Sequence, residues 1–418
     1  MTRSTPDERA ATGSHRRWIL LDTALTSHVG HHRTLAVALR TEARRRGLDL
    51  TMVGNAKLDP DLAAGLTALP LFRRSIYDRP ILDPIAGGLG AYVDAVPLLS
   101  ADLRSGVVGA IGADDVVIWP TADAIAISAT ARWFRDMPPS RRPMVAATFH
   151  RIEGMTDAST SPESIPRATL RLSALELGRL VPRERLFVAA TTPGLAADVA
   201  ALIQHAVAVC PVPIPTDSVD RAIPAAAERH VEGRPRIAIP GIPRGDKRAG
   251  DLPAALLALV RALPAAPIVV QTDGQGADGV ANPPLPTVAG VEVRYGSLAD
   301  DAYRSLFAEA AIVVMLHGRD AYRQRASGVF VDAVAAGCVP VVAAGTWMAD
   351  EIAAGHAAGV VYEDATADGI AAAVVAATAG LDLLSAQAAG RIAGWRRRHG
   401  IGPWLDQIVA GLGLTGDG

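Results

Sequence analysis

The chain has 418 residues, 50% of them apolar and 20% charged, and its formal net charge is -2. One hydrophobic core rarely serves so long a chain, and the length fits two domains of about 150–200 residues each. A net charge close to zero excludes the broad basic field that attracts nucleic acid. We therefore expect a globular protein of two domains without a nucleic-acid partner.

The N-terminal segment 1–16 is polar and has no apolar stretch of the kind found in signal peptides, so we expect a disordered tail. No apolar run reaches the roughly 18–20 residues that span a bilayer. Cys210 and Cys338 both lie in apolar runs, which favours buried, reduced thiols over a disulfide framework. These features predict a cytoplasmic protein and leave peripheral membrane contact open.

Short apolar runs alternate with amphipathic or alanine-rich stretches, a pattern that predicts parallel strands joined by helices. The first unit consists of a strand at Trp18–Thr23, a helix over 33–46 and a strand over 48–54. Further strands are predicted at 115–120, 143–150, 186–192 and 206–215. We assign residues 17–215 to a first Rossmann-like domain.

Prolines and charges then interrupt the pattern, so we place an interdomain linker at 216–234. A second alternating series has predicted strands at 235–241, 266–271, 290–296, 311–316, 338–344 and 359–363. We assign 235–381 to a second Rossmann-like domain and expect two helices in 382–418 to pack back on the first domain. The predicted fold class is α/β, with two doubly wound parallel sheets facing a cleft.

The segment Tyr322–Met348 contains the strongest candidate site. Ser327 and Gly328 open a predicted helix, and the free backbone N–H groups of Ser327 to Val329 suit a phosphate. Asp332 lies one turn further on, where a carboxylate can accept hydrogen bonds from ribose hydroxyls. The alternative, equally open from the spacing, is that Ser327 caps the helix and Asp332 stabilises its first turn.

A second candidate lies in the loop between a predicted strand and the helix that starts at Asp251. Arg244 and Lys247 occupy this loop, where two cations can neutralise a diphosphate and stabilise its departure. A solvated charged loop is the alternative interpretation. The position of the loop relative to the Asp332 segment favours the diphosphate.

Two further candidates come from the N-terminal half. Gly30 follows the first strand and lets the backbone approach a ligand closely. His28, His31 and His32 surround it, but no companion carboxylate or cysteine cluster is apparent in the sequence, so we predict no metal site. His150 ends a predicted strand, where it either points toward the cleft or is a satisfied strand-end histidine.

The segment 322–348, YRQRASGVFVDAVAAGCVPVVAAGTWM, resembles the donor-site signature of the retaining GT-B glycosyltransferases of family 4. That signature is Glu-x₇-Glu followed by Ala-x-Ala-x-Gly-x-Pro-Val-Val. The resemblance implies that Asp332 holds the nucleotide ribose and that the first acidic position falls at Gln324, a neutral residue that can still hydrogen-bond a sugar hydroxyl. It also implies that Arg244 and Lys247 contact the donor diphosphate, while Gly30 and His150 approach from the N-terminal domain.

The implied function is transfer of a sugar from a nucleoside diphosphate sugar to a hydroxyl of a carbohydrate or glycolipid acceptor, as in polysaccharide biosynthesis. The resemblance further implies retention of configuration, with no metal and no other cofactor. Two alternatives stay open. One is another nucleotide-sugar enzyme on the same fold, such as an epimerase. The other, kept open by Gln324, is a non-catalytic module that binds a nucleotide or scaffolds polysaccharide assembly.

Overall fold

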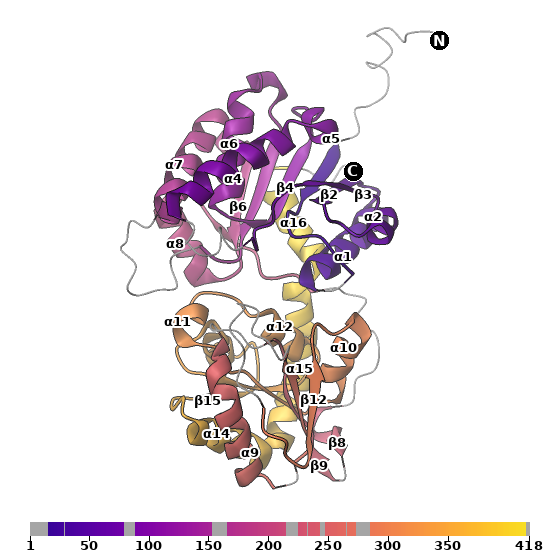
Figure 1. Cartoon of the computed structure of the whole chain (residues 1–418), viewed down its shortest axis with the longest axis vertical. Coiled ribbons are helices and arrows are strands. Elements are labelled where there is room, and N and C mark those ends of the chain that lie inside the picture. Colours follow the sequence, from indigo (N-terminus) through magenta and orange to yellow (C-terminus); the bar gives the residue numbers. More distant parts are fainter. Residues whose placement is uncertain are drawn as a thin grey trace.

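The computed structural model describes residues 16–28, 30–78, 88–152, 165–214, 225–231, 233–242, 247–264, 266–272 and 285–414. These residues form two α/β domains, each built on a parallel sheet with helices on both faces (Figure 1). The predicted class of two doubly wound domains is confirmed.

In the N-terminal domain, seven described strands pair in parallel in the order β3-β2-β1-β4-β5-β6-β7. The strands are β1 (Arg17–Leu21), β2 (Asp49–Asn55), β3 (Ala68–Phe72), β4 (Val116–Ala122), β5 (Met144–Phe149), β6 (Leu186–Ala190) and β7 (Ala208–Val209). The helices are α1 (His31–Arg46), α2 (Pro60–Leu66), α4 (Gly88–Leu103), α5 (Gly106–Gly109), α6 (Ala124–Arg135), α7 (Ile165–Leu180) and α8 (Pro193–Ile203).

The C-terminal domain repeats this arrangement with six described strands in the order β12-β11-β10-β13-β14-β15. The strands are β10 (Ile237–Ile239), β11 (Ile268–Thr272), β12 (Val291–Tyr295), β13 (Ile312–Val314), β14 (Val339–Ala343) and β15 (Val360–Tyr362), and a short antiparallel ribbon, β8 (His230–Val231) and β9 (Arg234–Pro235), precedes them. The helices are α9 (Leu252–Ala262), α10 (Asp300–Glu309), α11 (Arg319–Tyr322), α12 (Gly328–Ala335), α13 (Trp347–Ala353), α14 (Ala367–Ala379) and α15 (Leu381–His399), followed by α16 (Ile401–Gly411).

Both sheets reverse their strand order once. The reversal lies between β1 and β4 in the first sheet and between β10 and β13 in the second. Connections that leave two neighbouring strands in opposite directions open a crevice at the carboxyl ends of those strands, and open α/β sheets bind their ligands there. The topology therefore marks one ligand position in each domain.

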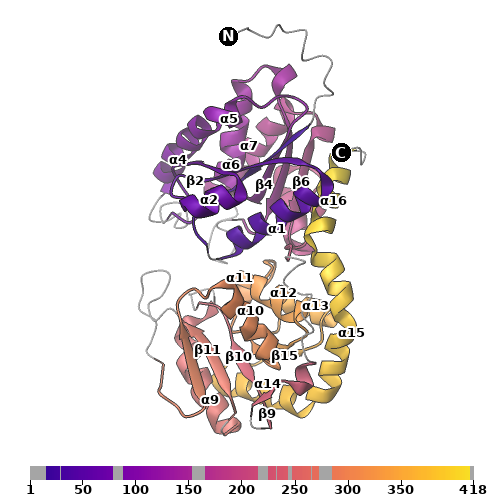
Figure 2. The ribbon, with the colours of Figure 1, turned by 90° about the vertical axis from the view of Figure 1, so that its right-hand side faces the viewer.

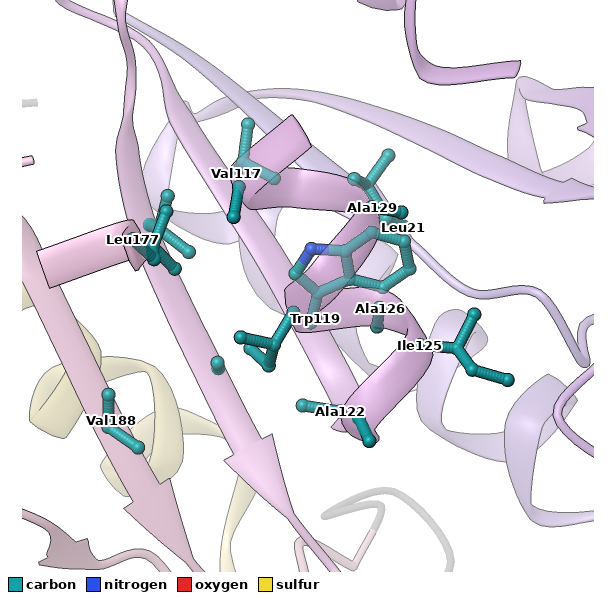
Figure 3. Packing of buried hydrophobic residues seen from close by; sticks show 14 of the residues in the cluster. Leu21, Val117, Trp119, Ala122, Ile125, Ala126, Ala129, Leu177 and Val188 are labelled. Atoms are coloured by element: carbon teal, nitrogen blue, oxygen red, sulfur yellow. The ribbon is translucent and has the colours of Figure 1, made fainter. Parts of the chain in front are cut away.

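The core of the N-terminal domain depends on small residues opposite large ones. Trp119 of β4 is buried, and Figure 3 shows its indole beside Ala126 and Ala129 of α6. These alanines let α6 approach the sheet closely enough for the Trp119 indole N–H to donate to the Thr130 hydroxyl at 3.0 Å. The indole N–H therefore has a hydrogen-bond partner, and burying the Trp119 ring leaves no unpaired polar group.

The last two helices belong to different domains. Figure 2 shows α15 along the C-terminal domain and α16 beside the N-terminal one. In α15 the Trp395 indole N–H donates to the Val331 carbonyl at 3.0 Å, whereas α16 buries Trp404 in the N-terminal core. The chain crosses at Gly400, which forms a β-bridge with Ile214. The crossing therefore lies later than the predicted boundary at residue 382, because α15 packs on α12.

The second half of the predicted linker also belongs to the C-terminal domain. Ala226 is buried in its core, and Arg229 is buried under α10 and α12. Residues 215–224, where the linker prediction began, lie outside the described residues.

The sequence analysis assigned no element between β2 and β4. The structure has the edge strand β3 and the helix α4 there, each with an internal proline, Pro70 and Pro97. Proline removes a backbone donor and weakens both strand and helix patterns, and an edge strand tolerates it best.

Within the described residues, no single helix is long and apolar enough to cross a membrane; α14 and α15 meet the length and composition test only as a pair bent by 80°. Cys210 and Cys338 are both buried and free, as predicted.

Candidate active site

Gly241 marks the carboxyl end of β10, at the reversal point of the C-terminal sheet. Its φ of +89° belongs to the region that favours glycine. A Cβ there would lie 2.8 Å from the Lys247 Nζ and 3.3 Å from the Val329 Cγ2. Lys247, predicted to contact the diphosphate, and the start of α12 therefore both lie next to Gly241. Arg244 lies outside the described residues.

Helix α12 begins at the predicted position, and Ser327 caps it, which is the alternative role left open for this residue. The Ser327 hydroxyl accepts the Phe330 N–H at 3.3 Å and hydrogen-bonds the His317 Nε2 at 3.1 Å. Gly328, the first helical residue, is exposed. The helix therefore presents its positive end to solvent beside Lys247, which is an arrangement suited to an anion.

A small pocket that is open to solvent lies at this edge of the sheet. Its floor is fixed by Gln271, which is buried and bridges two strand ends: its amide oxygen accepts the Gly241 N–H at 2.8 Å, and its amide nitrogen donates to the Gly296 carbonyl at 3.0 Å. The lining residues are Ile239, Pro240, Gly241, Lys247, Leu252, Gln271, Val314, Leu316 and His317.

Asp332, one turn into α12, is held by a residue that the sequence analysis did not identify. The Tyr303 hydroxyl of α10 donates to the Asp332 Oδ2 at 3.0 Å. Burial raises the pKa of Asp332 to about 7, although the hydrogen bond from Tyr303 acts in the opposite direction. The carboxyl group is therefore close to its midpoint of ionisation at neutral pH.

This shift predicts that Asp332→Asn stabilises the ligand-free protein at high pH. The folded-state pKa of about 7 exceeds the ordinary value of 3.8, so ionisation costs folding free energy that grows from about pH 4 and is complete above pH 7. We expect the variant to gain on the order of 4 kcal/mol of unfolding free energy at pH 8 and nothing at pH 4. Urea unfolding at both pH values measures this, with the exposed Asp301→Asn as the control; an equal change at both pH values would rule out the ionisation argument.

The carboxyl edge of the N-terminal sheet has a chain of hydrogen bonds that starts at Asp22, directly after β1. The Asp22 Oδ2 lies 2.8 Å from the His32 Nδ1, and the His32 Nε2 lies 2.9 Å from the Tyr77 hydroxyl. That hydroxyl lies 3.3 Å from the His31 Nε2. Asp22 and His32 are buried and Tyr77 is 40% exposed, so a buried charged pair supports exposed polar groups.

Two histidines of this edge, the buried His32 and the partly buried His150, have opposite pKa shifts. Burial alone would lower the pKa of His32, but the charge of Asp22 and the Tyr77 partner outweigh it and raise the pKa to about 10. Burial, reinforced by the charges of His32 and Arg325, lowers the pKa of His150 to about 4. His150 is therefore neutral at pH 7, and its Nε2–H donates to the Pro120 carbonyl at 3.0 Å.

Replacing Asp22 by Asn tests the His32 assignment. Without the carboxylate, burial dominates and the pKa of His32 falls from about 10 to below its ordinary 6.5, so the ring is neutral at pH 7. We expect the His32 Cε1–H resonance to titrate near pH 10 in the native protein and below pH 6.5 in the variant. A native His32 that titrates between pH 6 and 7 would contradict the paired imidazolium.

Contacts across the domain boundary bring the two carboxyl edges together. Arg33 of α1 forms an ion pair with Asp300, the first residue of α10. The Thr192 hydroxyl donates to the Gln324 carbonyl, and a Cβ at Gly194 would lie 3.1 Å from the Gln324 Cγ. Gln324, which the sequence predicts to contact the donor sugar, therefore packs against the start of α8 in the other domain.

Gly30 and His28, the remaining candidates of the N-terminal loop, both have defined surroundings. Gly30 has a φ of +93° and is the N-cap of α1 without a side-chain hydrogen bond. His28 pairs with Asp59 at 2.8 Å. No group of three or more His, Cys, Asp or Glu side chains that could hold a metal ion occurs among the described residues.

Several solved structures share this architecture. The chain resembles sucrose-phosphate synthase from Thermosynechococcus elongatus, with a TM-score of 0.63 and 13% identity over 95% of this chain and 99% of that one. It also resembles a glycosyltransferase from Rickettsia africae, with a TM-score of 0.62 and 12% identity over 96% and 98%. The Anabaena protein HepE, in complex with UDP and glucose, gives 0.61 and 12% over 96% and 100%.

This chain has the GT-B fold. The expected fold is thus confirmed along nearly the whole chain. No family model matches the sequence, and a search of curated proteins finds no match.

Within this GT-B framework, five polar residues of the two edges were not predicted from the sequence: Asp22, Tyr77, Gln271, Tyr303 and His317. Asp22, Gln271 and His317 lie at or just past the carboxyl ends of predicted strands, a signal that could have found them. Tyr77 and Tyr303 carry no such signal, because their roles depend on partners 45 and 29 residues away.

Proposed function

We propose that this protein is a glycosyltransferase that moves a sugar from a nucleoside diphosphate sugar to a hydroxyl acceptor. The observation that carries the proposal is the convergence of Lys247 and the amino end of α12 at Gly241, with the Asp332 carboxylate one turn beyond. A diphosphate fits the first two groups and a ribose fits the third. The GT-B fold supports the proposal, because solved proteins of similar structure include one in complex with UDP-glucose and one bound with UDP-2-fluoro-glucose.

In the proposed reaction, the bond between the sugar and the diphosphate breaks while the acceptor oxygen bonds to the anomeric carbon. The departing diphosphate gains negative charge, which Lys247 and the α12 amides stabilise. Arg244, from the same loop, is proposed to contribute a second cation. The acceptor attacks on the face from which the diphosphate departs, so the configuration is retained, and the leaving phosphate takes the acceptor proton. This mechanism requires no metal and no other cofactor.

A release assay tests the activity. Purified protein is incubated with UDP-glucose, GDP-mannose, ADP-glucose or TDP-glucose, with and without a mixture of simple sugars, and free nucleoside diphosphate is measured. We expect release from at least one donor, with loss in Lys247→Ala and retention of anomeric configuration in the earliest product detected by NMR. Nucleotide binding without release from any donor would favour the non-catalytic alternative, and an inverted product would refute retention.

A further inference from the structure

Tyr303 and Asp332 form a partly buried polar pair beside the proposed donor site. Tyr303 lies in the first turn of α10, which starts at the carboxyl edge of the C-terminal sheet directly after β12. Its ring packs edge-on against Phe307 at 5.0 Å between centroids, and its hydroxyl donates to the Asp332 Oδ2 at 3.0 Å. Both side chains remain partly exposed. A ligand at this edge can therefore reach them.

The direction of the hydrogen bond between them is fixed by chemistry. Burial, followed by the charge of Asp332, raises the pKa of Tyr303 well above its ordinary value, so the phenol keeps its proton. The phenol therefore donates and the carboxylate accepts. The donation leaves lone pairs on the phenol oxygen, and the second carboxylate oxygen is also an acceptor. The pair thus offers two neighbouring acceptor oxygens.

Two neighbouring acceptors match a vicinal diol, which has two O–H donors on adjacent carbons. A glutamate at position 332 would reach one methylene further and could span the diol with its own two oxygens. The shorter Asp332 has one oxygen engaged by Tyr303. The phenol oxygen replaces that acceptor and also fixes the carboxylate orientation, since its proton holds the Oδ2.

We propose that Tyr303 and Asp332 act as one unit that recognises the 2′,3′-diol of a ribonucleotide, with each residue accepting from one hydroxyl. This inference rests on the proposed donor site, and it adds a binding residue that selects ribonucleotides over deoxyribonucleotides. The phenol has a second effect, because its hydrogen bond favours the ionised form of Asp332. Near neutral pH, Tyr303 therefore contributes to binding in two ways: its oxygen accepts a hydrogen bond from the diol, and its proton keeps Asp332 ionised.

Calorimetric titration of the full chain with nucleotides tests the pair. The probes are UDP, GDP and ADP and their 2′-deoxy and 3′-deoxy forms, each measured from pH 6 to 9 with native protein and Tyr303→Phe. In native protein we expect the tightest ribonucleotide to bind about 10-fold better than at least one deoxy form, the value of one hydrogen bond to a charged group. In Tyr303→Phe we expect this ratio to fall below about 2-fold for the deoxy form that lacks the hydroxyl bound by Tyr303, and to persist for the form that lacks the hydroxyl bound by Asp332.

The pH dependence separates recognition from packing. Removing the phenol raises the pKa of Asp332 further, so the pH below which ribonucleotide affinity declines moves upward in Tyr303→Phe. A packing role predicts no such shift, and Phe307→Leu, which alters the packing but keeps the hydroxyl, serves as the matched control. An unchanged deoxy ratio and pH profile in Tyr303→Phe would overturn the inference alone. Failure of native protein to bind any of these nucleotides would overturn the proposed donor site and the inference together.

Discussion

Lys247→Ala is expected to weaken binding of a nucleoside diphosphate by about 10- to 100-fold, the value of a charge-assisted contact worth about 1.5–3 kcal/mol. The physical reason is placement. The ammonium lies at Gly241, beside the start of α12, so its charge and the helix end act on the same anion. Because a diphosphate gains charge as it leaves, transfer should suffer more than binding. Calorimetric titration gives the first quantity and the release assay gives the second.

Arg248→Ala is the matched control, since it removes one positive charge from the adjacent residue. Its guanidinium is paired with Asp251 at 2.6 Å. We expect less than a 3-fold change in nucleotide affinity for this variant, as for an exposed ion pair. Equal losses in both variants would indicate a general field of the loop, and no loss in Lys247→Ala would remove Lys247 from the site.

Arg229→Met should destabilise the C-terminal domain by about 3–5 kcal/mol, because three buried carbonyl groups lose their donor. The Arg229 guanidinium is buried and donates to the carbonyls of Phe307, Ala310 and Ala336 and to the Cys338 thiol. Phe307 and Ala310 lie at the carboxyl end of α10, and Ala336 is the C-cap of α12. The positive charge of Arg229 therefore stabilises the carboxyl ends of α10 and α12, the helices that carry Tyr303 and Asp332.

Urea unfolding measures the loss, and Arg304→Met, which removes an exposed arginine of α10, should change the free energy by less than about 0.5 kcal/mol. An unchanged or higher unfolding free energy in Arg229→Met would mean that the cost of burying the guanidinium cancels the bonds that it makes.

Much of the fold could be predicted because both sheets are covered on two faces. Strands such as β4 and β14 are then continuous apolar runs, which stand out between helices of a different period. Where that condition fails the prediction fails too, as at the edge strand β3 with Pro70. The position at which the chain crosses between the domains, from α15 to α16, could not be predicted either. Trp395 and Trp404 look alike in the sequence, but they pack on different domains.

In the candidate site, too, features that are local in the sequence could be predicted, and contacts between distant residues could not. Ser327, Gly328 and Asp332 are local features of one helix start, so the sequence could single them out as candidates, although their spacing left the capping alternative equally open. The partners that set the chemistry are distant in sequence: His32 owes its charge to Asp22, and Asp332 is oriented by Tyr303. Gln324 shows the limit of a motif position, because its contacts with Thr192 and Gly194 arise only when two domains meet.

On the proposed function, a nucleoside diphosphate binds the carboxyl edge of the C-terminal sheet, between Gly241, the start of α12 and the first turn of α10. Hydrogen–deuterium exchange with and without saturating UDP, GDP, ADP or TDP tests this binding position. With at least one nucleotide, we expect slower exchange in peptides that cover 241–247, 327–332 and 300–303, and no such protection in Lys247→Ala at the same concentration. Protection confined to the N-terminal domain, or none with any of the four, would contradict the proposed position.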